Sequence, residues 1–108
     1  MTDWQAKLQK EFDMAEQART RENEGQARVC ARRAAGIAIR EYLTRQGLRP
    51  PSTSAYDLLN LIKDDPLLSP EIKLFAGHLT LRVTEEFKLP VDADLVAEAR
   101  KLCNELLK

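Results

Sequence analysis

The stretch QARVCARRAAGIAIREYLTRQ, residues 26–46, decides the fold. It contains no proline and is rich in Ala, Arg, Ile and Leu, so it predicts a single helix. Apolar side chains cover most of the girth of that helix, and they are Cys30, Ala31, Ala34, Ala35, Ile37, Ala38, Ile39, Tyr42 and Leu43. Only the side that carries Arg33 and Arg40 is polar. We therefore expect this helix at the centre of a bundle, with its small residues, Gly36 among them, allowing close neighbours.

Two charged residues interrupt the apolar surface of this helix. Arg28 and Arg32 lie on the face of Ala35, Ile39 and Leu43. A charge on a packed face must find a partner or line a cleft, because an unpaired buried charge is costly. This arginine pair is the first indication of a functional site.

Four further helices are predicted from apolar spacing and from start and stop signals. They cover about residues 2–23, 55–63, 70–88 and 93–107. The residues suited to cap their N-termini are Thr2 or Asp3, Ser54, Ser69 and Asp92. Gly25 and Gly47 are suited to the left-handed conformation that ends a helix.

The inward positions follow the helical period. Those of the first helix are Trp4, Leu8, Phe12, Ala15 and Ala18. Those of the later three are Leu58, Leu59, Ile62, then Ile72, Phe75, Ala76, Leu79, Val83, Phe87, then Leu95, Val96, Ala99, Leu102, Cys103 and Leu106. No strand pattern occurs, so the sequence predicts one all-α domain over residues 1–108, a four- to five-helix up-and-down antiparallel bundle.

Composition excludes several classes of function. The 17 Lys and Arg residues balance the 17 Asp and Glu residues, so no global basic field argues for nucleic acid, although a local basic patch can exist. Cys30 and Cys103 have no CxxC spacing and no histidine companions, so we expect two buried core thiols, no metal and no cofactor. No secretory signal and no apolar run of about 20 residues occurs, so we expect a cytoplasmic protein without a membrane span.

The segment HLTLRVTEEFKLPV, residues 78–91, carries the other candidate site residues. Arg82 lies at the edge of the predicted buried face, with His78 one turn before it and Glu85 and Glu86 within a turn and a half after it. One interpretation is an ordinary helix surface with weak i,i+4 ion pairs. The other places Arg82 in a cleft with the two arginines of the central helix, where a phosphate or the two glutamates would lie between the guanidinium groups.

Three segments of this sequence resemble the HEPN domain family (higher eukaryotes and prokaryotes nucleotide-binding). They are CARRAAGIAIREYLTRQG, SAYDLLNLI and RVTEEFKLPVDADLVAEARKL, and the resemblance covers nearly the whole chain. The run Arg-x-x-Glu-Glu-Phe is similar to the family's Arg-x-x-Ala-Asp-Tyr motif, with Phe87 at the Tyr position. The resemblance implies a helical bundle that often pairs as a homodimer. It also implies either RNA cleavage or partnership with a minimal nucleotidyltransferase, commonly in toxin–antitoxin or defence pairs.

The RNA-cleaving members of that family use an arginine and a histidine four to six residues apart. Arg82 matches the arginine, but no histidine follows it, and His78 precedes it. Because cleavage needs a proton donor and acceptor that Phe87 cannot supply, we lean towards a protein that is not an enzyme.

Three hypotheses of function remain open. The first is a non-catalytic HEPN-like module that binds a nucleotide, RNA or a nucleotidyltransferase-type protein through Arg82, Arg28, Arg32 and the two glutamates. The second is a metal-independent ribonuclease that uses Arg82 with His78. The third is a plain helical dimerisation domain. Leu74 and Leu81, seven residues apart, predict a second apolar face that is either covered by a loop or a homodimer contact.

Overall fold

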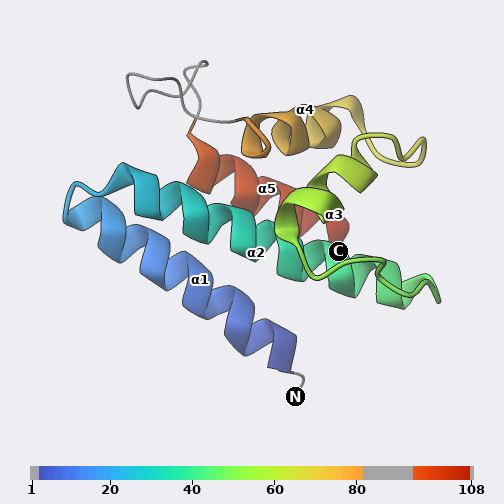
Figure 1. The fold of residues 1–108 in the computed structure, drawn as a ribbon, viewed down its shortest axis with the longest axis horizontal. Coiled ribbons are helices and arrows are strands. Elements are labelled where there is room, and N and C mark those ends of the chain that lie inside the picture. Colours follow the sequence, from blue (N-terminus) through green and yellow to red (C-terminus); the bar gives the residue numbers. More distant parts are fainter. Residues whose placement is uncertain (1–2, 82–93, 108) are drawn as a thin grey trace.

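The computed structural model describes residues 3–81 and 94–107. Within those ranges the chain forms helices and no strand, which confirms the predicted all-α bundle. The helices are α1 (Asp3–Thr20), α2 (Glu24–Arg45), α3 (Ala55–Ile62), α4 (Pro70–Leu79) and α5 (Leu95–Leu106) (Figure 1). Across the described ranges, no helix combines the length and the apolar character that a membrane span requires.

The α2 helix lies at the centre, as its sequence predicts, and it contacts each of the other four helices. Its buried residues are Ala27, Cys30, Ala31, Ala34, Ala35, Gly36, Ala38, Ile39 and Leu43. Ile37 and Tyr42, which the pattern also assigned to the apolar surface, are only half-buried. The Tyr42 hydroxyl reaches the chain after α3, where it donates to Asp65 Oδ2 over 3.2 Å. Small side chains thus form the surface on which the other helices pack.

The ends of the helices fix their directions. Arg19, in the last turn of α1, pairs with Glu24 at the start of α2 and with Asp94 at the start of α5. At the opposite end, the side chain of Arg45 in α2 donates to the carbonyl of Leu107 after α5. Therefore α2 and α5 run in the same direction, while α1 is antiparallel to α2 (Figure 1). Strict up-and-down alternation in chain order would make α2 and α5 antiparallel, so this parallel pair breaks the alternation.

Most predicted helix starts and stops are confirmed. Ser54 and Ser69 accept hydrogen bonds from the amides of Asp57 and Ile72, and Gly47 has a φ of 76° directly after α2. The structure corrects two others.

Between α1 and α2 the residue with positive φ is Glu22 (60°), and the predicted Gly25 lies inside α2. The side chain of Asn23 accepts the amide of Gln26 and so starts α2 earlier than the sequence pattern indicated. Asp94, not Asp92, caps α5 by accepting the amide of Ala97 over 3.1 Å.

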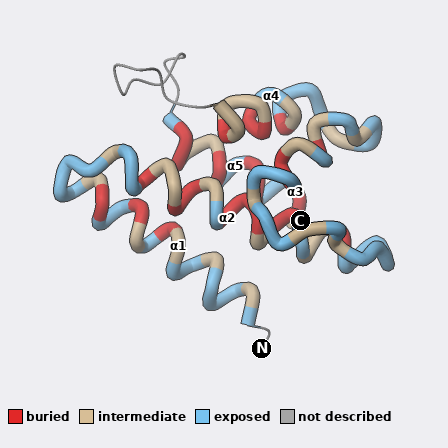
Figure 2. The backbone as a smooth tube through the Cα atoms, viewed as in Figure 1, coloured by how far each residue is buried: buried red, intermediate tan, exposed pale blue. Residues whose placement is uncertain are grey.

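The core is continuous through α2, α3, α4 and α5, and α1 covers one side of it (Figure 2). All the inward positions predicted for α3 and α5 are buried, as are both free cysteines. In α1, Phe12, Ala15 and Ala18 are buried, but Trp4 and Leu8 are only half-buried. The reason is that α1 packs mainly against α2, so its N-terminal half lies at the edge of the bundle (Figure 1).

The close approach of α2 and α3 gives a test of this packing. A Cβ atom on Gly36 would lie 2.8 Å from the Cβ of Ala55 and 3.1 Å from its Cα. We expect Gly36→Ala to lower the free energy of unfolding by about 1–2 kcal/mol, because the clash outweighs the gain in helix propensity.

Gly77 in α4 is the matched control, since a Cβ there would meet nothing within 4 Å. Gly77→Ala should raise the free energy of unfolding by about 0.5–1 kcal/mol. Urea unfolding followed by circular dichroism measures both variants. If the two substitutions changed stability in the same direction, the proposed α2–α3 contact would be wrong.

Candidate functional site

Arg32, one of the two arginines predicted to mark a site, contacts the C-terminal end of α4. Its side chain is half-buried. Its Nε donates to the carbonyl of Leu79 over 2.6 Å, and its Nη2 donates to the carbonyl of Leu81 over 2.7 Å. The last carbonyls of a helix lack partners within the helix and carry partial negative charge. Arg32 therefore satisfies the end of α4 from the neighbouring helix.

This contact explains why α4 is shorter than its sequence pattern indicated. The helix was predicted to reach about Lys88, but it ends at Leu79 with Thr80 as its cap. In a continuing helix the Leu79 carbonyl would accept an amide four residues further on, whereas here it accepts Arg32. The Thr80 hydroxyl also donates to the carbonyl of Gly77 over 2.8 Å. Leu81 consequently lies beyond the helix, so it does not share a helical face with Leu74.

Arg28 lies one helical turn before Arg32 and is also half-buried. Burial lowers the pKa of Arg32, and the positive charge of Arg28 lowers it further. Among the described residues, no carboxylate lies within ion-pair distance of either guanidinium group. The two like charges are therefore not neutralised by residues 3–81 or 94–107.

His78 has a partner that the sequence did not indicate. Its Nδ1 lies 2.6 Å from Oε1 of Glu98 in α5, and the two side chains are only 21% and 14% exposed. The pair joins the last turn of α4 to the first turn of α5. The ribonuclease hypothesis pairs His78 with Arg82, and in the structure one ring nitrogen of His78 lies against the Glu98 carboxylate.

The remaining predicted site residues, Arg82, Glu85 and Glu86, lie outside the described residues, as do Val83 and Phe87. The structure does show what holds the chain on both sides of them. Leu81 is held through its carbonyl by Arg32, and Asp94 is held through its carboxylate by Arg19.

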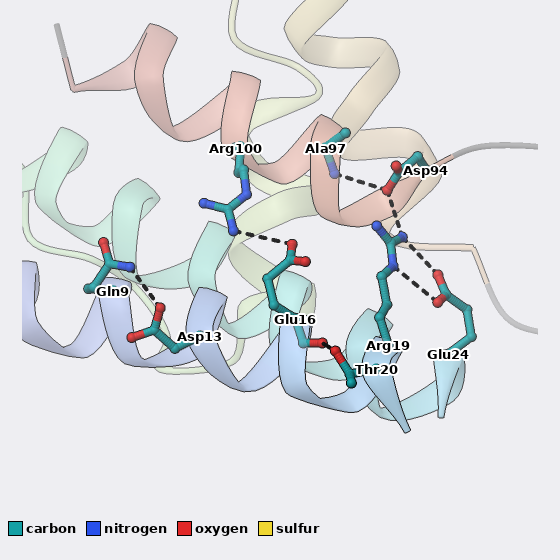
Figure 3. Close-up of polar contacts among 9 residues, drawn as sticks. All are labelled: Gln9, Asp13, Glu16, Arg19, Thr20, Glu24, Asp94, Ala97 and Arg100. Atoms are coloured by element: carbon teal, nitrogen blue, oxygen red, sulfur yellow. Dashed lines mark hydrogen bonds and ion pairs between the residues drawn. The ribbon is translucent and has the colours of Figure 1, made fainter. Parts of the chain in front are cut away.

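The contact of Arg19 with Asp94 belongs to a group of polar contacts that joins α1, α2 and α5. Figure 3 shows the Arg19 guanidinium between the carboxylates of Glu24 and Asp94, at 2.8 and 2.6 Å. These hydrogen bonds raise the pKa of Arg19, with that to Glu24 the larger cause, and the bond from Arg19 lowers the pKa of Asp94. Nearby, Arg100 of α5 lies 3.3 Å from Glu16 of α1.

No metal site is evident in the described part of the chain. Residues 3–81 and 94–107 contain no group of three or more His, Cys, Asp or Glu side chains placed to hold a metal ion. The two cysteines are free and buried, and the Cys103 thiol contacts the carbonyl of Ala34 at 3.8 Å. The chemistry at this end of the molecule is therefore that of the two arginines and the His78–Glu98 pair.

We expect Arg32→Met to lower the free energy of unfolding by about 1–2 kcal/mol, because the carbonyls of Leu79 and Leu81 lose a charged donor. Arg32→Lys should lower the free energy of unfolding by a smaller amount, because an ammonium group lacks the planar fork of donors that spans both carbonyls.

The adjacent Arg33 provides the control for that experiment. It is exposed and lies 4.0 Å from Glu11, so Arg33→Met should change stability by less than about 0.5 kcal/mol. Urea unfolding of the three variants and the wild type measures the difference. Equal effects of Arg32→Met and Arg33→Met would show that the carbonyl contacts do not stabilise the fold.

The Arg19–Asp94 pair should make stability depend on pH. Because the pKa of Asp94 is lowered in the folded protein, its contribution is complete above the ordinary value of 3.8 and is lost as the pH falls through the folded pKa. The side chain is 55% exposed, so the contribution should stay below about 1 kcal/mol. Asp94→Asn keeps the N-cap but removes the charge. Its deficit in unfolding free energy should be present near neutral pH and absent in strong acid, and an unchanged deficit would exclude the ion pair as its cause.

Comparisons of this chain with family models, curated proteins and solved structures give no match. The fold and the contacts of the described residues are therefore the basis for assigning a function. They show an all-α bundle in which Arg32 of α2 contacts the C-terminal end of α4, with Arg28 one helical turn before it.

Proposed function

We propose that this chain is a non-catalytic, HEPN-like helical module that binds a phosphate-bearing ligand, a nucleotide or RNA, through Arg28 and Arg32. The observation that supports this proposal is the half-buried pair of guanidinium groups with no carboxylate at ion-pair distance among the described residues. A phosphate placed between them would remove their mutual repulsion.

The hydrogen-bonding capacity of Arg32 is compatible with such a ligand. A guanidinium group has five N–H donors, and the two carbonyls of the α4 end engage Nε and Nη2. Nη1 forms no hydrogen bond with residues 3–81 or 94–107, and arginine binds phosphate through paired donors. Arg82, the match to the family motif, directly follows Leu81 in the sequence, and it is the third cation in this proposal.

The resemblance to HEPN domains also supports a protein partner of the minimal-nucleotidyltransferase type, in a toxin–antitoxin or defence pair. In that case the same arginines would contact a nucleotide or an acidic surface that the partner presents. A homodimer belongs to this proposal too, with Leu74, which is 55% exposed on α4, as its candidate contact.

A ribonuclease is the second candidate, and the His78–Glu98 pair is the observation that favours it. A carboxylate that holds one ring nitrogen of a histidine leaves the other nitrogen for proton transfer, as general acid–base catalysis requires. The charged group that would stabilise the phosphate in this reaction is Arg82.

Titration with ATP and with a labelled single-stranded RNA tests the binding proposal. A ligand at 100 times its Kd should add about 2.7 kcal/mol to the free energy of unfolding and so raise Tm. Arg28→Gln should abolish this increase, since it removes one guanidinium and leaves the Arg32 contacts with α4 in place.

Arg33→Gln removes an equal charge from the exposed side of α2 and serves as the control. Binding that Arg28→Gln and Arg33→Gln weaken equally would show a general charge effect and not a site. Absence of any Tm increase with millimolar ATP or RNA would exclude the binding function.

The same protein preparation separates the other candidates. Cleavage of the labelled RNA that is lost in both His78→Ala and Arg82→Ala would establish the ribonuclease, and intact RNA would exclude it. Sedimentation at micromolar concentration tests the homodimer, because a mass of 12.3 kDa is that of the monomer.

A further inference from the structure

A cavity of about 280 Å³ lies at the other end of α2, between its last turns and the first turns of α1. Its lining includes Trp4, Lys7, Ile37, Arg40, Glu41 and Pro50. Arg28 and Arg40 are twelve residues apart on α2, about 18 Å along the helix axis. The cavity is therefore separate from the arginine pair of the proposed function.

The charged residues of this cavity leave it with two unneutralised cations. Lys7 and Arg40 are exposed, and neither forms an ion pair with any of the described residues. Glu41 is the one acidic residue in the lining, and its Oε1 is bound to the Nε of Arg45 at 3.2 Å. A cavity with two such cations favours an anionic occupant.

The rest of the lining is suited to a flat apolar group. Ile37 and Pro50 are half-buried, and the Trp4 indole forms a wall. Trp4 is held in place by Arg45, whose guanidinium carbon lies 5.5 Å from the centre of the indole ring. Ile37 belongs to the predicted apolar stripe of α2, and the described residues leave it only half-buried. Ligand cavities commonly combine such apolar walls with a few convergent charged groups.

We propose that this cavity binds a small anion that carries a flat ring, with the anionic group between Lys7 and Arg40 and the ring against Trp4. Nucleoside monophosphates and aromatic carboxylates share this chemistry. The inference does not depend on the proposed function, because it uses different residues at the opposite end of α2.

The sequence offers a direct probe, since Trp4 is the only tryptophan. Its fluorescence and the NMR signal of its indole N–H report on this cavity and on a neighbouring cavity that Trp4 also lines, between α1 and α5. Weakening by substitution of Arg40, which lines only the first of the two, assigns a change to the proposed site. We expect AMP or phenylacetate to change both signals. Adenosine, which has the ring without the anion, and inorganic phosphate, which has the anion without the ring, should bind at least about tenfold more weakly.

Arg40→Gln should weaken binding about tenfold, because it removes a charged donor from the cavity. The matched control is Arg33→Gln, which removes the same charge from a position two helical turns earlier on the same face of α2. Arg33 does not line the cavity, so this variant should leave the Kd within about twofold. If only AMP changed the Trp4 signals, the ligand would be a phosphate, and if only phenylacetate changed them, it would be a carboxylate. Both results would support the proposal.

Three results would overturn the inference. The first is an unchanged indole signal with millimolar AMP and phenylacetate. The second is equal weakening by Arg40→Gln and Arg33→Gln. The third is binding that Arg28→Gln abolishes and Arg40→Gln does not, which would assign the ligand to the site of the proposed function and leave this cavity empty.

Discussion

The fold depends on how closely the backbone of α2 can be approached by its neighbours. Small side chains allow this along most of the helix, and at Gly36 there is no room even for a methyl group beside Ala55. Because dispersion contacts add up only at close range, a centre built from alanines stabilises the bundle through short distances and not through large side chains. Charged residues of α2 accordingly lie either on its exposed face, as Arg33 and Arg40 do, or where they meet a helix end, as Arg32 does.

The contact of Arg32 with α4 shows that one guanidinium can serve two purposes. It completes the hydrogen bonding of a helix end that lacks partners of its own, and this anchors α4 to the central helix. It also places a half-buried positive charge beside Arg28, which is unfavourable without an anion nearby. A structural role for Arg32 is thus compatible with ligand binding by Arg28 and Arg32. The contact with α4 fixes the position of the positive charge that a ligand would meet.

Much of the helical arrangement follows from local sequence patterns. Caps such as Ser54 and Ser69 and the inward positions of α3 and α5 depend on residues within a few positions of each other, so periodicity and capping rules predict them. The end of α4 could not be predicted in this way, because it is decided by an arginine 47 residues earlier in the chain. The His78–Glu98 pair was missed for the same reason, since helical spacing places each residue on a face but does not say which faces meet. The half-burial of Trp4 likewise depends on where α1 lies.

Both cysteines are buried, and Cys103 lies in the contact between α2 and α5, where its thiol meets the backbone of Ala34. Burial raises the pKa of Cys103 to about 12, so the reactive thiolate is scarcely populated in the closed bundle. Oxidants and alkylating reagents therefore react with Cys103 only when the packing around this thiol opens and exposes it. The rate at which such a reagent modifies Cys103 reports how often this part of the core opens, under conditions where the native state prevails.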